Sequence, residues 1–165
     1  QAKEAFKLIC ELTSEDPTAH FYLGVAYGDL KEFELSEKSL RRAIELNPDY
    51  AQALNYLGYT FIDHNRNFRE AEKLIKRALK IEPDNGAYLD SLGWLYYKKG
   101  RLKEAKVLLE KAAEVYPDPV IFDHLGDLFF RMKDANKALL NWDKSLKLKS
   151  PQDDVKKKID SLKNK

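Results

Sequence analysis

Glycine recurs in this chain at a nearly constant interval. Gly24, Gly58, Gly93 and Gly126 lie 34, 35 and 33 residues apart, and each follows a leucine. The residue three positions after each glycine is a tyrosine or a phenylalanine. A period of this length indicates a repeat architecture, in which each unit buries its apolar face against the next unit.

Each interval contains the pattern of two helices. After every glycine come a small residue, a bulky apolar residue and a second small residue at fixed offsets, and then a proline that a helix cannot accommodate in its interior. The first small residues are Ser36, Ala71, Ala105 and Ala138, the bulky ones are Leu40, Ile75, Leu109 and Trp142, and the second small ones are Ala43, Ala78, Ala112 and Ser145. Glycine opposite small residues allows two helices to approach closely, so each unit is predicted to be a helical hairpin.

This arrangement resembles the tetratricopeptide repeat family, whose pattern of Leu-Gly-x-x-Tyr, Ala, bulky apolar residue, Ala and Pro is met in all four units. The resemblance implies an all-α fold, a right-handed superhelical solenoid of antiparallel helical hairpins with one concave and one convex surface. We expect a single domain over 1–165, with repeats at 17–50, 51–85, 86–118 and 119–150. We expect 2–13 to be the second helix of a truncated repeat and 151–163 to be a capping helix.

Composition limits the other possibilities. The 165 residues are 44% apolar, which suffices for one helical core. No apolar run approaches the roughly 18 residues of a membrane-spanning helix, so no membrane insertion is predicted. Cys10 is the only cysteine, so no internal disulfide forms. Because the chain begins inside a repeat, we interpret it as a fragment of a longer protein. Its compartment, cytoplasmic or bacterial periplasmic or envelope-associated, and its oligomeric state stay open.

The family resemblance implies that the first helix of each hairpin lines the concave groove. Helical spacing then places ten candidate partner-binding residues there: Asn55, Tyr59, Ile62, Asp63, Asp90, Trp94, Tyr97, Asp123, Asp127 and Phe130. Aromatic rings among carboxylates suit a protein or peptide that offers apolar and basic residues. The alternative for the rings is packing against one another across adjacent helices. For Asn55 the alternatives are a clamp on a ligand backbone and a solvated helix position.

Some members of the family hold a partner's terminal carboxylate with Lys, Asn and Arg. Other residue types occupy the corresponding positions here, so this clamp is absent: Phe21, Val25, Tyr56, Ala87 and Ser91. The stretches 88–97 and 118–127 are similar to the last repeats of bacterial scaffold proteins of this family, some of them envelope lipoproteins. That similarity implies a scaffold or adaptor role in a bacterial cell.

Other classes of function find less support in the residues. His20, His64 and His124 have no partners at metal-ligand spacing, and no phosphate-binding loop appears, so we predict no enzyme, no metal and no cofactor. Nucleic-acid binding is an alternative because residues 137–165 hold nine Lys against four Asp, although the acidic groove opposes it. A further alternative is self-assembly into a homo-oligomer through the truncated repeat at 2–13.

Overall fold

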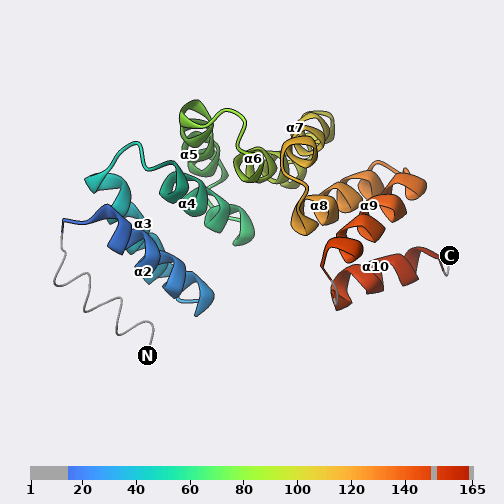
Figure 1. Cartoon of the computed structure of the whole chain (residues 1–165), viewed down its shortest axis with the longest axis horizontal. Coiled ribbons are helices and arrows are strands. Elements are labelled where there is room, and N and C mark those ends of the chain that lie inside the picture. Colours follow the sequence, from blue (N-terminus) through green and yellow to red (C-terminus); the bar gives the residue numbers. More distant parts are fainter. Residues whose placement is uncertain (1–14, 150–151, 164–165) are drawn as a thin grey trace. The chain divides into compact units, whose positions relative to one another are not determined.

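The computed structural model describes residues 15–149 and 152–163. This part of the chain contains nine α-helices, numbered α2 to α10, and no β-strand (Figure 1). The helices are α2 (Pro17–Asp29), α3 (Phe33–Leu46), α4 (Ala51–Asp63), α5 (Phe68–Ile81), α6 (Gly86–Lys98), α7 (Leu102–Val115), α8 (Pro119–Arg131), α9 (Ala135–Leu148) and α10 (Asp153–Lys163). The predicted all-α architecture of helical hairpins is confirmed.

The chain divides into two compact units, Gln1–Pro83 and Asp84–Lys165, which we call unit 1 and unit 2. The described part of unit 1 contains the hairpins α2–α3 and α4–α5. Unit 2 contains the hairpins α6–α7 and α8–α9, followed by α10. The single domain over 1–165 stays a prediction, and the helix expected at 2–13 and Cys10 lie outside the described residues.

Capping residues fix where several helices begin. Asp16 accepts a hydrogen bond from the backbone N–H of Thr18 at 2.8 Å. Asp118 accepts one from the N–H of Val120 at the same distance, and Pro17 and Pro119 follow these caps in the first helical turn. A cap that satisfies a free N–H, followed by a proline that needs none, is the arrangement helix starts favour. The predicted capping helix begins at Asp153 in the structure, as α10.

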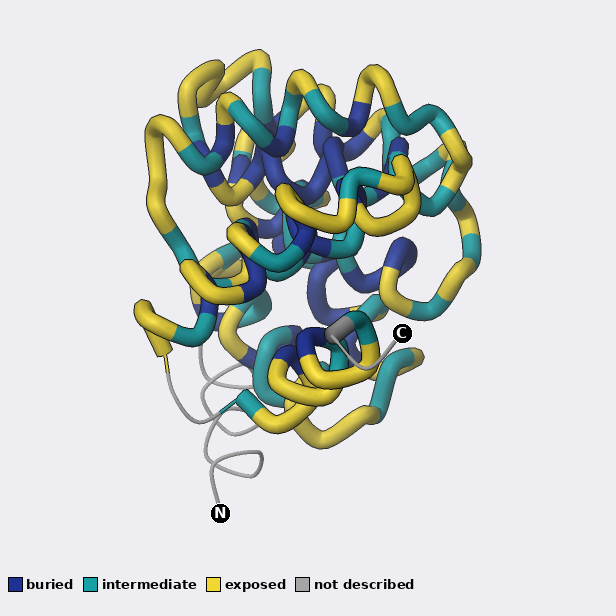
Figure 2. Tube along the Cα trace, turned by 90° about the vertical axis from the view of Figure 1, so that its right-hand side faces the viewer, coloured by how far each residue is buried: buried dark blue, intermediate teal, exposed yellow. Residues whose placement is uncertain are grey.

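The small residues of the repeat lie where paired helices meet. All eight of them, at the two small positions of each of the four repeats, are fully buried. A side chain on Gly24, Gly58 or Gly93 would place its Cβ 2.7 Å from the bulky residue of the second helix, and one on Gly126 would come closer still to Trp142. Figure 2 shows the buried segments in dark blue where helices face one another, and the exposed ones in yellow at the turns. The close approach of the two helices therefore leaves little room for a side chain at these positions.

Candidate partner-binding surface

Asp90 and His124 form a buried pair between the first helices of unit 2. The Nδ1 of His124 lies 2.8 and 3.1 Å from the two carboxylate oxygens of Asp90, and each residue is only 6% exposed. The sequence analysis placed Asp90 in the groove as a carboxylate for a basic partner. The structure corrects this placement, because Asp90 on α6 holds His124 on α8 inside the unit.

Trp94 lies in a stack of rings above this pair. Its ring is nearly parallel to that of His124, with centroids 3.9 Å apart, and to that of Tyr97, with centroids 4.5 Å apart. The ammonium group of Lys98 is 5.3 Å from the Trp94 ring centroid. Trp94 is only partly exposed. The stack connects α6 to α8, so Trp94 contributes to packing whether or not a partner also touches it.

Tyr97 lies at the edge of the stack. Arg131 donates a hydrogen bond to the backbone carbonyl of Tyr97 at 2.7 Å, and its guanidinium carbon lies 5.1 Å from the Tyr97 ring centroid. Burial raises the pKa of the Tyr97 hydroxyl, and the charge of Asp127 adds to the rise. The ring is therefore held in place, with its hydroxyl neutral at ordinary pH.

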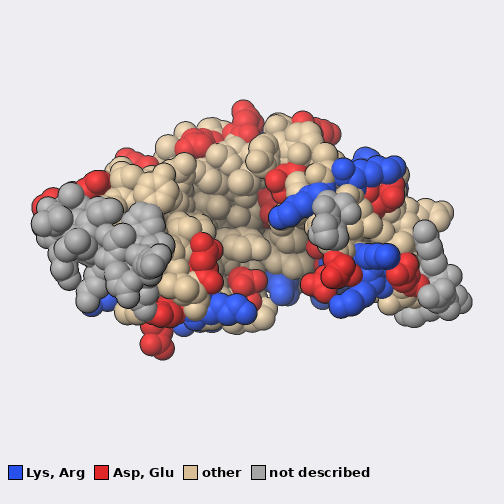
Figure 3. Space-filling view, turned by 60° about the horizontal axis from the view of Figure 1, so that its bottom comes forward, with Lys and Arg blue, Asp and Glu red and all other residues tan. Residues whose placement is uncertain are grey.

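Asp123 and Asp127 bind a cation of the chain itself. The Nζ of Lys158 on α10 lies 2.7 Å from Asp123 Oδ1 and 2.8 and 2.9 Å from the two oxygens of Asp127. Burial and the neighbouring carboxylate raise the pKa of Asp123 despite the lysine. For Lys158, burial lowers the pKa, but the hydrogen bonds and charges of both aspartates outweigh burial and raise it. Figure 3 shows blue and red atoms side by side over the C-terminal helices.

A cavity of about 430 Å³ lies beside this ion pair. Phe130, which is 46% exposed, and Trp142, which is 2% exposed, have ring centroids 5.8 Å apart. Trp142 Nε1 donates a hydrogen bond to Asp127 Oδ1 at 3.0 Å. The cavity is lined by Tyr97, Asp127, Phe130, Trp142, Lys157, Lys158, Ser161 and Leu162. The structure thus brings three predicted site residues together with five that the sequence analysis left out of the site.

Among the five missed residues, Lys157 and Lys158 belong to the lysine-rich end of the chain, which the sequence shows. The sequence analysis predicted a capping helix over 151–163. Trp142 is buried, and the Nζ of Lys158 lies 6.0 Å from its ring centroid. Nothing in the spacing of the lysines indicates which of them faces Asp123 and Asp127. That choice depends on how α10 docks.

Unit 1 carries the other four predicted residues, all on α4. Ile62 is fully buried, so its predicted position in the groove is wrong, and the residue belongs to the core. Asp63 is exposed and Tyr59 is partly exposed. Asn55 is partly exposed, but its Oδ1 is buried without a hydrogen-bond partner.

An aromatic cluster formed by α2, α4 and the residue before α4 was also missed in unit 1. Phe21 lies 5.2 Å from Tyr50 and 6.2 Å from Tyr56, measured between ring centroids. Burial, as the largest cause, raises the pKa of the Tyr56 hydroxyl. Two of these rings occupy positions that the carboxylate-binding members of the family use for their clamp, which agrees with the absence of that clamp here.

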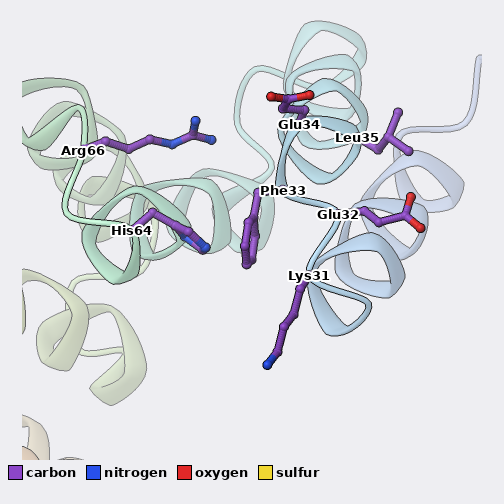
Figure 4. A pocket seen from close by; sticks show the side chains of 7 residues that line it. All are labelled: Lys31, Glu32, Phe33, Glu34, Leu35, His64 and Arg66. Atoms are coloured by element: carbon purple, nitrogen blue, oxygen red, sulfur yellow. The ribbon is translucent and has the colours of Figure 1, made fainter.

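A second cavity, of about 450 Å³, lies at the turns of unit 1 (Figure 4). The rings of Phe33 and His64 lie next to one another there, with centroids 3.5 Å apart and planes tilted by 59°, while Lys31 and Glu32 point away from them. Its lining is Lys31, Glu32, Phe33, Glu34, Leu35, His64 and Arg66. The lining mixes both signs of charge, so it favours no particular ligand charge.

Residues 15–149 and 152–163 contain neither a metal-binding group nor a membrane-spanning helix. No three His, Cys, Asp or Glu side chains in these ranges are grouped so that they could hold a metal ion. None of the described helices has both the length and the apolar character needed to cross a membrane.

The fold, built from hairpins with glycine and small residues between their helices, is that of a helical-repeat protein. Three family models described as tetratricopeptide repeats match residues 17–50, 39–73 and 64–123. The chain belongs to the tetratricopeptide repeat family.

Comparison with individual proteins gives the same fold. Over 91 residues, or 55% of this chain, it is 40% identical to the TPR repeat-containing protein PA4667 of Pseudomonas aeruginosa, and it spans only 15% of the length of that protein. Its structure is similar to that of TTC0263, a thermophilic TPR protein of Thermus thermophilus, with a TM-score of 0.85, 18% identity and coverage of 99% of this chain and 89% of that one. It is also similar to Pseudomonas aeruginosa pilF, with a TM-score of 0.78, 28% identity and coverage of 88% and 67%.

Proposed function

We propose that this chain is a non-enzymatic adaptor that binds a protein or peptide partner on the first helices of its repeats. In unit 2, an apolar side chain of the partner enters the cavity between Tyr97, Phe130 and Trp142. The observation that carries the proposal is this aromatic-walled cavity of about 430 Å³ beside the exposed ring of Phe130.

Size and chemistry support this use of the cavity. Pockets that bind ligands typically enclose about 300–1,000 Å³ and combine apolar walls with a few polar groups. Here the polar groups are Asp127, Lys157, Lys158 and Ser161. Aromatic residues are enriched among the side chains that carry most of the energy of protein interfaces.

Unit 1 offers a second, separate contact region on α4. The orphaned Oδ1 of Asn55 represents an unmade hydrogen bond, which costs about 1–3 kcal/mol when an acceptor stays buried without a partner. A rotation of the side chain would present this amide to a ligand backbone. The exposed carboxylate of Asp63 on the same helix suits a basic residue of the partner.

The alternatives rest on weaker observations. The basic C-terminal segment, on which nucleic-acid binding depends, has one of its lysines, Lys158, already bound to two carboxylates. Self-assembly was attributed to residues 2–13, which lie outside the described residues. We therefore propose protein binding rather than either alternative.

The proposal is tested by capture of proteins from a lysate of the source organism, with identification by mass spectrometry. Wild type is compared with Phe130→Asp, which places a charge at the mouth of the cavity. The matched control is Val107→Asp, because Val107 is 67% exposed on α7, a second helix of its hairpin. Circular dichroism first establishes that all three are equally helical.

We expect one or more proteins to be retained by wild type and Val107→Asp and lost with Phe130→Asp. Identical capture by all three would refute the assignment of binding to this cavity. Loss with Val107→Asp alone would move the binding surface to the second helices.

A further inference from the structure

The helix α10 presents to its own unit the side chains that a bound partner would present. Val155 and Ile159, four residues apart on one face, are buried, and Lys158 lies beside them. The exposed positions of α10 are mostly charged, among them Lys156, Lys157 and Asp160. The helix is thus amphipathic, with one lysine on its docked face.

Lys158 occupies the site that the sequence analysis reserved for a partner's basic residue. Asp123 and Asp127, one turn apart on α8, hold its ammonium group at 2.7 to 2.9 Å. Hydrogen bonds between charged groups are the strong ones in proteins, and these are partly shielded from water. The acidic pair of unit 2 therefore recognises a lysine on an apolar helix face.

One turn after Lys158, α10 does not fill the space between itself and the rest of unit 2. Ser161 and Leu162 line the cavity from the α10 side, opposite Tyr97, Phe130 and Trp142. Serine is a small residue facing three aromatic rings, and about 430 Å³ stays unfilled. A helix with a large apolar side chain at the position of Ser161 fills this space better than α10 does.

We propose that α10 is an internal substitute for a partner helix, and that the partner displaces it by presenting the same face with a better-fitting side chain. This inference rests on the proposed function of the cavity. The partner helix carries two apolar residues four positions apart, a Lys or Arg immediately before the second, and a large apolar residue three positions after that cation.

Displacement is physically reasonable because α10 is short. It has 11 residues, and isolated helices of fewer than about 12–15 residues are marginal in water. Two buried apolar side chains and the ion pair of Lys158 hold it in place, and Gln152, just before α10, donates hydrogen bonds to the carbonyls of Ser145 and Lys149. While α10 is docked the site is closed, so the apparent affinity of a partner equals its intrinsic affinity multiplied by the fraction of time that α10 leaves the site open.

The test uses the full chain and two labelled synthetic peptides. The probe peptide has the sequence of residues 152–163 with the change Ser161→Phe. The control peptide carries Lys158→Gln in addition. Binding is measured by fluorescence anisotropy to wild type, to Phe130→Asp and to Ile159→Ala, which loosens the internal α10. Amide hydrogen exchange of α10 is followed in parallel.

We expect the probe to bind wild type at least about tenfold more tightly than the control peptide does, because the control has lost its charge-assisted bonds to Asp123 and Asp127. Ile159→Ala should bind the probe several-fold more tightly, and Phe130→Asp more weakly. Saturating probe should accelerate exchange of the α10 amides, since displaced amides lose their protection.

Three results would overturn the inference. The first is a bound probe with α10 amides still protected, which would leave the proposed function of the cavity standing. The second is equal binding of the probe and the control peptide. The third is no binding of the probe to wild type or to Ile159→Ala. The proposed function of the cavity is refuted separately, if Phe130→Asp captures the same proteins from lysate as wild type does.

Discussion

Replacement of Gly126 by alanine tests the packing rule on which the whole repeat depends. An alanine Cβ there would overlap ring atoms of Trp142, which is 2% exposed and held by the bond from its Nε1 to Asp127. At Gly93, the equivalent position in the preceding hairpin, the nearest atom is Leu109 Cγ at 2.7 Å. Leucine has more freedom to rotate away than a buried indole, so the two substitutions should differ.

The expected magnitude follows from three opposing contributions. Alanine in place of glycine in a helix interior favours folding by about 1 kcal/mol. Overpacking a core costs about 1–3 kcal/mol, and the rigid ring places Gly126→Ala at the upper end. A displaced indole also weakens a hydrogen bond worth about 1 kcal/mol. The net loss is about 2–3 kcal/mol for Gly126→Ala and about 0–2 kcal/mol for Gly93→Ala.

Urea unfolding followed by tryptophan fluorescence measures this difference. The chain has two tryptophans, Trp94 and Trp142, and both lie in unit 2, so the signal reports that unit alone. With a slope of about 2 kcal/mol per molar urea, the midpoint of Gly126→Ala should fall by about 1 M. A midpoint equal to or above that of wild type, or a smaller loss than that of Gly93→Ala, would refute the packing argument.

Three further predictions concern individual contacts. His124→Ala should lower the urea midpoint of unit 2, because buried Asp90 is left without its hydrogen bond at a cost of about 1–3 kcal/mol in unfolding free energy. The double variant with Asp90→Ala should lose less stability than the sum of the two single variants, and additive losses would contradict the pairing. Because the folded pKa of Lys158 is raised, its stabilisation of α10 is present below the unfolded pKa of about 10.4 and disappears as pH rises through the folded value. Helicity by circular dichroism should therefore fall in alkali less for Lys158→Met than for wild type, and equal falls would contradict this. Ser36→Ala should destabilise unit 1 by about 1 kcal/mol, because Ser36 Oγ donates a buried hydrogen bond to the carbonyl of Gly24 at 2.7 Å. Urea unfolding followed by circular dichroism measures this loss, and a midpoint unchanged from wild type would show that the bond contributes nothing to stability.

Much of the fold follows from the sequence because its causes are local and repeated. Glycine, small residues and bulky residues at fixed offsets specify which helix faces meet, and four copies of the pattern make its period clear. Proline and capping aspartates mark helix starts within a few residues. Helices α2, α4, α6 and α8 begin at the residues where the predicted repeats begin.

The candidate site was less predictable, as Ile62 and Asp90 show. Helical spacing places both on the groove side, yet Ile62 is fully buried and Asp90 is bound to His124, 34 residues away. A helical wheel gives the direction of a side chain but not what stands opposite it. On the inner face of stacked helices, the neighbouring helix decides whether a residue is exposed.

The repeat, the helical hairpins and the family can thus be predicted from the order of the residues alone. The packed structure was needed to show that Lys158 meets Asp123, 35 residues earlier, and that Trp142 meets Asp127. These contacts depend on the docking of α10 and on side-chain rotamers, which many distant residues set together. A periodic pattern specifies the surfaces that every repeat shares, whereas a binding site arises where one repeat differs from the others.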